Sequence, residues 1–336
     1  MKILITGITG MTGSHLAEYL LGESKVEVHG TIRWRSNREN IADFEKKLHL
    51  HECELRDPHA VNRLIQKIRP QRIYHMAAQS NVAASWGSPH DTILNNVTAQ
   101  LNLFEAVRYL NFSDVRIHVA GSSEEYGMVH KNELPVKETN PLRPLSPYAV
   151  SKVTQDTLAY QYFHSYGLHI VRTRAFNQIG PKQGEVFAAS NFAKQIAQIE
   201  FNQREPVIKV GNVEVRRDFT DIRDVVRAYV MALEICEPGS VYNIGSGIAC
   251  SIKKILDNLI GLSSLLIHVE KDPSRMRPSE VPALICDCSK FIDKTGWQPR
   301  ISFKQSLFDL LDYWRSKLGR IQHFDDVEQL PAAVAG

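Results

Sequence analysis

The sequence predicts an α/β protein with a doubly wound parallel sheet and a smaller α/β region at its C-terminal end. Short apolar or alternating runs recur through the first half of the chain, and stretches with helical periodicity separate most of them. Strands that alternate with helices pair in parallel, and the helices then cover both faces of the sheet. The expected strands span residues 2–6, 26–32, 48–52, 72–76, 115–120 and 168–176.

After about residue 176 the chain changes to loops rich in Gly, Pro and Asn, with short strand candidates and separate helices. We expect residues 1–176 to form the sheet domain and residues 177–320 to form mainly a second region, interleaved with the end of the sheet. Residues 321–336 are expected to form a tail.

The composition excludes several classes of partner. A net charge of +3 over 336 residues is too small to indicate a nucleic acid or an anionic membrane surface. Five scattered cysteines form no disulfide framework, which is typical of a reducing compartment. No apolar run reaches the roughly 20 residues that span a bilayer, and the N-terminal MKILITG is typical of a strand rather than of a signal peptide. We therefore expect a cytoplasmic protein.

The first strand and the helix after it are joined by a glycine-rich turn. Gly7, Gly10 and Gly13 give the spacing G-x-x-G-x-x-G, a variant of the dinucleotide fingerprint. Glycines allow the backbone to approach a pyrophosphate, and the helix N-terminus attracts its charge. A turn that serves helix packing alone is the alternative, but the strand-turn-helix setting favours a Rossmann-like cofactor site.

Basic residues follow the second strand, where an NAD-binding protein carries a carboxylate. Arg33, Arg35 and Arg38 surround Ser36 and Asn37. Guanidinium groups bind phosphate in a bidentate manner, so this loop favours NADP(H) over NAD(H). A solvated basic loop is the alternative. The third strand ends where an adenine edge is expected to lie, at Leu55, Arg56 and Asp57.

We expect no metal site. His49, His51 and Cys53 alternate along the third strand and so share one face, but no fourth ligand accompanies them. Cys286 and Cys288 also lack a second Cys or His pair nearby.

A tyrosine and a lysine stand four residues apart in SPYAVSK, near the start of an expected helix. Tyr148 and Lys152 therefore share one helix face. An ammonium group beside a phenol favours the phenolate, so we expect Lys152 to lower the pKa of Tyr148 and to allow proton exchange with a substrate hydroxyl or carbonyl. A surface helix pair is the alternative, and the glycine-rich turn upstream weighs against it.

Taken together, these motifs resemble the nucleotide-sugar branch of the extended short-chain dehydrogenase/reductase family. The resemblance covers nearly the whole chain, through GITGMTG, HMAAQSNV, GSSEEYG, SPYAVSK, RAFNQIGP, VGNVEVRRDFTDIRDVV, VYNIGSG and RMRPSEVPALI in that order. It implies that Tyr148 and Lys152 are the catalytic pair, that Ser122 binds the substrate oxygen, and that Lys152 also holds the nicotinamide ribose. The further cofactor contacts that it implies are Thr9, Met11, Thr12, Ala77 and Ala78.

The resemblance also implies a substrate site. Glu124 matches the carboxylate that removes a proton from C5 of a 4-keto sugar in nucleotide-sugar dehydratases, and Ser123 matches a neighbouring position that is Asp or Ser in those enzymes. A non-catalytic cofactor-binding protein is disfavoured, because the glycine turn and the catalytic pair are intact. The implied contacts with the sugar nucleotide are Asn177, Lys209, Val210, Arg217, Arg277 and Glu280.

Two activities fit this resemblance. The N-terminal third resembles the GDP-mannose 4,6-dehydratases, and the chain from GSSEEYG onward resembles the NADPH-dependent reductases that convert GDP-4-dehydro-6-deoxy-D-mannose to GDP-D-rhamnose. The loop FNQIGP and the short approach to RPSEV favour the reductase. The dehydratase is the alternative, and an epimerase or dehydratase for another nucleotide sugar is a further one.

The resemblance alone implies the guanine base. It also implies a homodimer through a four-helix bundle of residues 92–110 and the helix that carries Tyr148, with a tetramer left open. Apolar residues at Leu94, Val97, Leu101, Phe104 and Leu110 agree in part with such a face, although most would also suit packing on the sheet.

Overall fold

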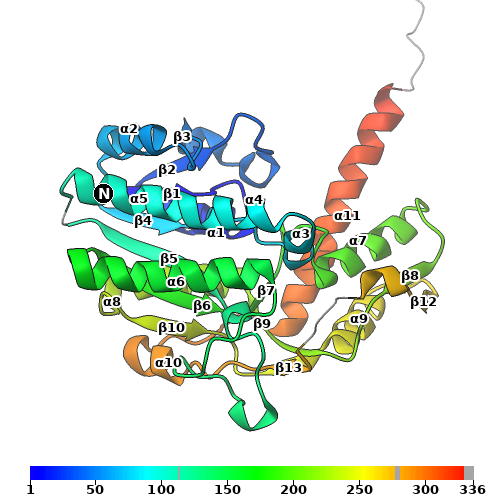
Figure 1. Ribbon diagram of the computed structural model, residues 1–336. Helices are drawn as coiled ribbons and strands as arrows, with labels where there is room; N and C mark the ends of the chain where they lie inside the picture. Colours follow the sequence, from blue (N-terminus) through cyan, green and yellow to red (C-terminus); the bar gives the residue numbers. More distant parts are fainter. Residues whose placement is uncertain (113, 277–280, 329–336) are drawn as a thin grey trace, which may run out of the picture.

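The computed structural model of the protein describes residues 1–112, 114–276 and 281–328. Its largest element is a seven-stranded sheet in the order β10-β6-β5-β4-β1-β2-β3, and all of its strand pairs are parallel (Figure 1). Strands β2 and β3 are added on one side of β1, and the strands from β4 onward are added on its other side. This change of side between β1 and β4 is typical of doubly wound dinucleotide-binding sheets. The predicted fold class is confirmed. The strands are β1 (Lys2–Thr6), β2 (Glu27–Ile32), β3 (His49–Glu52), β4 (Arg72–His75), β5 (Arg116–Ser122), β6 (His169–Ala175) and β10 (Val241–Ile244).

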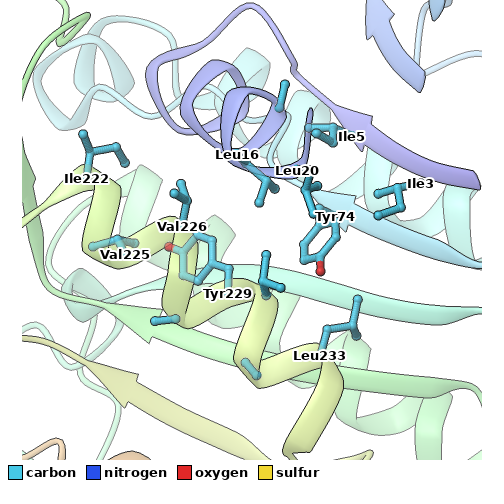
Figure 2. Close-up of a cluster of buried hydrophobic side chains, with 14 of the residues drawn as sticks. Ile3, Ile5, Leu16, Leu20, Tyr74, Ile222, Val225, Val226, Tyr229 and Leu233 are labelled. Atoms are coloured by element: carbon cyan, nitrogen blue, oxygen red, sulfur yellow. The ribbon is translucent and has the colours of Figure 1, made fainter. Parts of the chain in front are cut away.

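Helices cover both faces of this sheet. Figure 2 shows one face, where Leu16 and Leu20 of α1 and Val226 and Tyr229 of α8 lie in the same core as Ile3 and other residues of the sheet. A second core fills the opposite face. The first face carries α1 (Met11–Leu21), α8 (Ile222–Ile235) and α10 (Ser289–Thr295), and the second carries α2 (Pro58–Ile68), α5 (Ala99–Tyr109) and α6 (Pro147–Tyr166).

The helix expected over residues 92–110 is present, but its pitch changes in the middle. It consists of α4 (Pro89–Ile93), a π-helical turn η3 (Leu94–Thr98) and α5. The wide turn carries Asn96, whose buried side chain donates to the carbonyl of Gln79 at 3.1 Å and to the hydroxyl of Ser151 at 2.8 Å. These bonds tie the turn to α6 and to the chain after β4, which accounts for a helix that departs from its regular pitch.

A smaller second region follows β6, and its own apolar core lies between helices and short strands. Its four-stranded sheet has the order β11-β9-β13, with β7 also paired to β9, and β12 and β8 form a separate pair. The strands are β7 (Asn177–Ile179), β8 (Val207–Val210), β9 (Arg216–Asp221), β11 (Ala249–Ser251), β12 (His268–Lys271) and β13 (Ala283–Leu284). The helices are α7 (Ala188–Glu200), α9 (Ile252–Ile260) and α11 (Phe303–Glu328).

The two regions are interleaved. Between β9 and β11 the chain returns through α8 and β10 to the large sheet, so that the second region is not a separate length of sequence. At the C-terminal end, α11 continues to Glu328 (Figure 1). The tail expected from residue 321 is therefore helical up to that point.

The remaining elements are α3 (Val82–Gly87), η1 (Glu39–Ile41), η2 (Glu45–Lys47), η4 (Ser123–Glu125), η5 (Lys131–Glu133) and η6 (Pro273–Arg275).

None of the helices in the described part of the chain is long and apolar enough to cross a membrane.

A buried carboxylate fastens the segment before α11 onto α8. One oxygen of Asp224 accepts the backbone N–H groups of Arg300 and Ile301, each at 2.8 Å, and the other accepts from the Arg227 guanidinium at 2.7 Å. The side chain of Asp224 is only 3% exposed. Without the carboxylate, two backbone donors lose their partner and Arg227 loses its counter-charge.

We predict that Asp224→Ala lowers the free energy of unfolding by roughly 2–4 kcal/mol, because each unsatisfied buried donor is costly. Urea denaturation of the variant and the wild type measures this difference. The control is Asp257→Ala on α9, whose ion pair with Lys253 is exposed and should contribute less than about 1 kcal/mol. Equal losses in the two variants would contradict the account.

Candidate functional site

A cavity of about 1520 Å³ opens where the parallel strands end. The residues that directly follow each strand from β1 to β6 line it, and α7, β9 and the turn at η6 close it from the side of the second region. Ligands of doubly wound sheets bind at this edge, where the strand order reverses. The cavity is therefore the candidate site.

The glycine turn forms one wall of the cavity and leaves no room for side chains. Gly7 has a φ of +69°, and a Cβ there would lie 2.8 Å from the Cα of Ala77. A Cβ on Gly13 would lie 2.3 Å from the carbonyl oxygen of Gly7. Helix α1 begins after Gly10 without a side-chain cap, so its first N–H groups are open to a ligand. This backbone arrangement fits a dinucleotide pyrophosphate. Thr9, Met11, Thr12, Ala77 and Ala78 also line the cavity.

Of the residues predicted to surround the adenosine ribose, two line the cavity and others do not. Arg33 and Ser36 line the cavity, and the backbone N–H of Arg33 donates to the hydroxyl of Ser36 at 2.8 Å. Arg35 is not part of the lining, because its guanidinium lies over the Trp34 ring, 4.1 Å from the ring centre.

Of the three residues predicted at the adenine edge, two line the cavity as well. Leu55 and Arg56 line the cavity. Asp57 does not, since its carboxylate caps α2 by accepting the N–H of His59 at 2.9 Å.

The predicted catalytic residues meet at the floor of the cavity. Strand β5 runs two residues further than expected, so that Ser122 lies at its end. A hydrogen bond joins the hydroxyls of Ser122 and Tyr148. Lys152 lies one turn later on α6 and donates from Nζ to the carbonyl of Ala120 at 2.8 Å. The three residues line the same cavity, and Tyr148 and Lys152 are only 8% and 5% exposed.

The pKa of Tyr148 differs from the expectation. Burial raises it above the ordinary value, the bond with Ser122 opposes this rise, and the nearby charge of Glu124 adds to it. The expected lowering by Lys152 is wrong for this structure. The Lys152 ammonium lies 6.0 Å from the ring centre of Tyr148 and is turned to the carbonyl of Ala120. Burial also lowers the pKa of Lys152, and the carboxylate of Glu125 opposes that change. In this arrangement Tyr148 is a neutral proton donor.

The predicted substrate residues fall into three groups. Ser123, Glu124, Asn177 and Arg217 line the cavity. Arg217 is held in place because its Nη1 donates to the carbonyl of Val281 at 2.8 Å. Lys209 and Val210 are not part of the lining: the first is exposed on β8 and the second is buried in the core of the second region. Arg277 and Glu280 lie outside the described residues.

Several lining residues were not foreseen. Arg275 donates to the side-chain oxygen of Asn191 at 2.9 Å, and both reach the cavity from the second region. Arg275 stands in the same RMRPSEV motif as Arg277, so the motif contained a signal. Gln178 accepts a hydrogen bond from Thr12 at 2.9 Å and donates to the Tyr229 hydroxyl at 3.2 Å. No sequence spacing connects these three residues, because the contact exists only through the fold.

The histidines on the third strand, which were considered as metal ligands, stack on a histidine of the neighbouring strand β2. The rings of His49 and His51 stack on His29 of β2, with centroid distances of 4.8 and 5.3 Å. Among the residues that the structure describes, no group of three or more His, Cys, Asp or Glu side chains is placed to hold a metal ion. Cys286 and Cys288 are buried in a small apolar cluster.

Comparison with known proteins identifies the family to which this chain is similar. The model of the family described as GDP-mannose 4,6 dehydratase matches residues 4–310. A GDP-6-deoxy-D-mannose reductase from Pseudomonas aeruginosa is 30% identical over 317 aligned positions, which cover 94% of this chain and 98% of the relative. A GDP-mannose 4,6-dehydratase from Vibrio cholerae is 32% identical over 347 positions, which cover 92% of each chain.

The solved structure of the enzyme named RMD from Pseudomonas aeruginosa, complexed with NADPH, superposes with a TM-score of 0.82 and 29% identity over 94% of this chain and 99% of that one. The resemblance inferred from the motifs is confirmed. The chain belongs to the GDP-mannose 4,6-dehydratase family of extended short-chain dehydrogenases/reductases, and it is an NAD(P)-dependent enzyme that modifies a nucleotide sugar.

Proposed function

We propose that the protein reduces the C4 keto group of GDP-4-dehydro-6-deoxy-D-mannose with NADPH and so forms GDP-D-rhamnose. The observation that carries this choice over dehydration is the length of the two alignments. The reductase alignment fits 94% of the 336 residues into 317 positions, which leaves hardly any gaps in this chain. The dehydratase alignment spreads a smaller share over 347 positions, more than the chain itself contains. The chain therefore lacks segments that the Vibrio cholerae dehydratase has.

The residues present fit NADP(H). The turn of Gly7, Gly10 and Gly13 would hold the pyrophosphate against the first N–H groups of α1. Arg33 at the end of β2 would bind a 2′-phosphate, with the Ser36 hydroxyl beside it. No carboxylate stands at the end of β2, where one would repel that phosphate. When bound, NADPH supplies the hydride for C4.

Residues of the protein would supply the proton for the reduction and would position the substrate. Tyr148 is neutral and buried, so it can donate its proton to the oxygen at C4 as that oxygen gains charge. Ser122, already bonded to the Tyr148 hydroxyl, would hold the same oxygen in line. Lys152, which lines the same cavity, would hold the nicotinamide ribose. Cavity-lining Arg217 and Arg275, together with Asn177, would hold the GDP part.

A second candidate function is the 4,6-dehydratase reaction, and one observation favours it. The carboxylate of Glu124 lines the cavity close enough to Tyr148 to influence its pKa. In that reaction Tyr148 would act first as a base, and Glu124 would remove the C5 proton before water leaves C6. The reductase needs no such base, so in our proposal Glu124 only positions the sugar.

We also propose a homodimer in which α5 and α6 form a four-helix bundle with the same helices of a second copy. Exposed apolar side chains at Leu94, Val150 and Tyr160 on this side of the molecule support it. Phe104 is fully buried against the sheet, the alternative that the sequence left open for these apolar residues.

We predict that the purified protein oxidises NADPH in proportion to added GDP-4-dehydro-6-deoxy-D-mannose, because reduction consumes one hydride per sugar. The absorbance of NADPH and chromatography of the sugar nucleotides measure this. Conversion of GDP-mannose without net change in NADPH would instead support the dehydratase.

We predict that Tyr148→Phe lowers kcat by roughly 10²- to 10⁴-fold, the usual contribution of a general acid, while NADPH still binds. Fluorescence titration of NADPH and steady-state kinetics separate the two effects. Tyr166→Phe is the matched control, since Tyr166 lies on the same helix and its side chain is exposed. Turnover at the wild-type rate in Tyr148→Phe would refute the catalytic role.

We predict that Arg33→Ala weakens the preference for NADPH over NADH by roughly 10- to 100-fold, the contribution of a charge-assisted hydrogen bond to phosphate. The ratio of kcat/KM for the two cofactors measures the preference. Arg63→Ala, on the exposed side of α2, controls for a general loss of positive charge. An unchanged ratio in Arg33→Ala would remove Arg33 from the cofactor site.

A further inference from the structure

A sugar nucleotide bound in the cavity would place its base at the end that the second region forms. In the proposed reaction the sugar lies at Tyr148 and Arg217 holds part of the GDP group, so the base extends further away from the cofactor. The lining at that end comes from the segment before α7, the start of α7 itself, the residues after β8 and the turn η6.

A carboxylate lies at this end of the cavity. Among the residues that the structure describes, three carboxylates line the cavity. Glu54 follows β3 on the cofactor side, Glu124 lies in η4 beside the catalytic pair, and Glu185 precedes α7. A carboxylate repels a diphosphate, so its presence in a nucleotide site is unfavourable unless the ligand offers it hydrogen-bond donors. Glu185 therefore needs a partner on the base.

Two residues of α7 hold Glu185 in place. The backbone carbonyl of Glu185 accepts from Asn191 Nδ2 at 3.1 Å, and its Oε2 accepts a hydrogen bond from the Lys194 ammonium. The side chain of Glu185 is still 51% exposed, and a carboxylate can accept about four hydrogen bonds. A ligand in the cavity can therefore reach the carboxylate in addition to Lys194.

The same asparagine ties this segment to a cation of η6. Asn191 Oδ1 accepts from Arg275 Nη1 at 2.9 Å, and Arg275 Nε donates to Asp272 at 3.3 Å. Arg275 and Glu185 thus lie on either side of Asn191, and both line the cavity. The guanidinium is suited to the diphosphate, which leaves the carboxylate for a neutral part of the ligand that carries donors.

Apolar side chains lie beside these two charged groups. Val186 and Phe187 follow Glu185 in the chain, Met276 follows Arg275, and all three line the cavity. They are 64%, 36% and 55% exposed. Exposed apolar side chains that line a cavity are typical of a surface that a ligand covers, and the flat face of a base stacks well on such a surface. An apolar wall with an acceptor at its edge fits a nucleobase.

The pairing edge of guanine matches this arrangement. It carries two adjacent donors, N1–H and the N2 amino group, and the two oxygens of one carboxylate can accept from both. Adenine, uracil and cytosine have no two adjacent donors on this edge. We propose that Glu185 selects guanine by accepting hydrogen bonds from N1–H and from the N2 amino group. The inference rests on the proposed function, because it specifies how the base of the GDP-sugar is recognised.

The test compares GDP with inosine diphosphate, which lacks only the N2 amino group, and with UDP. Calorimetric titration of each nucleotide into the wild type and into Glu185→Gln measures Kd without any turnover. Because hydrogen bonds to a charged group are strong, we expect the wild type to bind GDP roughly tenfold or more tightly than inosine diphosphate. Glu185→Gln should lose most of this preference, while UDP should lose little or no affinity.

Two control variants separate this contact from other effects. Glu214→Gln removes an exposed carboxylate of the second region that is not part of the cavity lining. Lys194→Met removes the ion-pair partner of Glu185 and keeps the carboxylate. Both should retain the preference for GDP. Since the Glu185 side chain is half exposed, Glu185→Gln should fold like the wild type, and circular dichroism with thermal unfolding checks this.

Three results would overturn the proposal. They are equal affinity of the wild type for GDP and inosine diphosphate, an unchanged preference in Glu185→Gln, and an equal loss of affinity for all three nucleotides in that variant, which would indicate a structural role. A wild type that does not oxidise NADPH with the keto sugar would instead refute the proposed reaction, and the binding preference would still decide the role of Glu185.

Discussion

The parallel register of β5 against β6 sets the chemistry of the cavity. It pairs Gly121 with Arg174 and Ser122 with Ala175. Because both strands end at the same edge, the Ser122 hydroxyl and the start of β7 at Asn177 face the same space. A shift of one residue would turn the Ser122 side chain to the other face of the sheet and away from Tyr148. The site therefore depends on strand pairing before it depends on any single side chain.

Burial governs the electrostatics of this site. The cavity floor contains a neutral tyrosine and a lysine whose pKa is lowered. Behind these residues lies a pair of buried carboxylates, Glu125 and Asp156, which are paired with Arg172 and Arg174. In such surroundings each charge needs a partner within the fold, since water cannot supply one. A phenol that stays protonated suits the delivery of a proton to a reduced carbonyl, which is the direction of the proposed reaction.

Much of this architecture could be predicted from local sequence. The glycine turn needs close backbone approach, and the large sheet follows from runs of apolar residues; both are properties of short segments. Contacts between distant segments could not be predicted in this way. Gln178 meets Thr12 only because the chain after β6 folds against the glycine turn, and Arg275 meets Asn191 only through the fold of the second region. The expectation that Lys152 lowers the pKa of Tyr148 was wrong, because helical spacing gives proximity but not burial or the competing carbonyl of Ala120. Arg35 and Asp57 stand at the expected places in the chain, yet their side chains bind Trp34 and the start of α2.

The central claim is that the enzyme transfers a hydride from cofactor to C4 and leaves it there. Incubation of the protein with GDP-4-dehydro-6-deoxy-D-mannose and NADPH deuterated at the transferred position, followed by NMR of the product, tests this directly. The account predicts GDP-D-rhamnose with one deuterium at C4 for each NADPH oxidised. Recovery of the unreduced keto sugar, by protein that converts GDP-mannose without consuming cofactor, would contradict it.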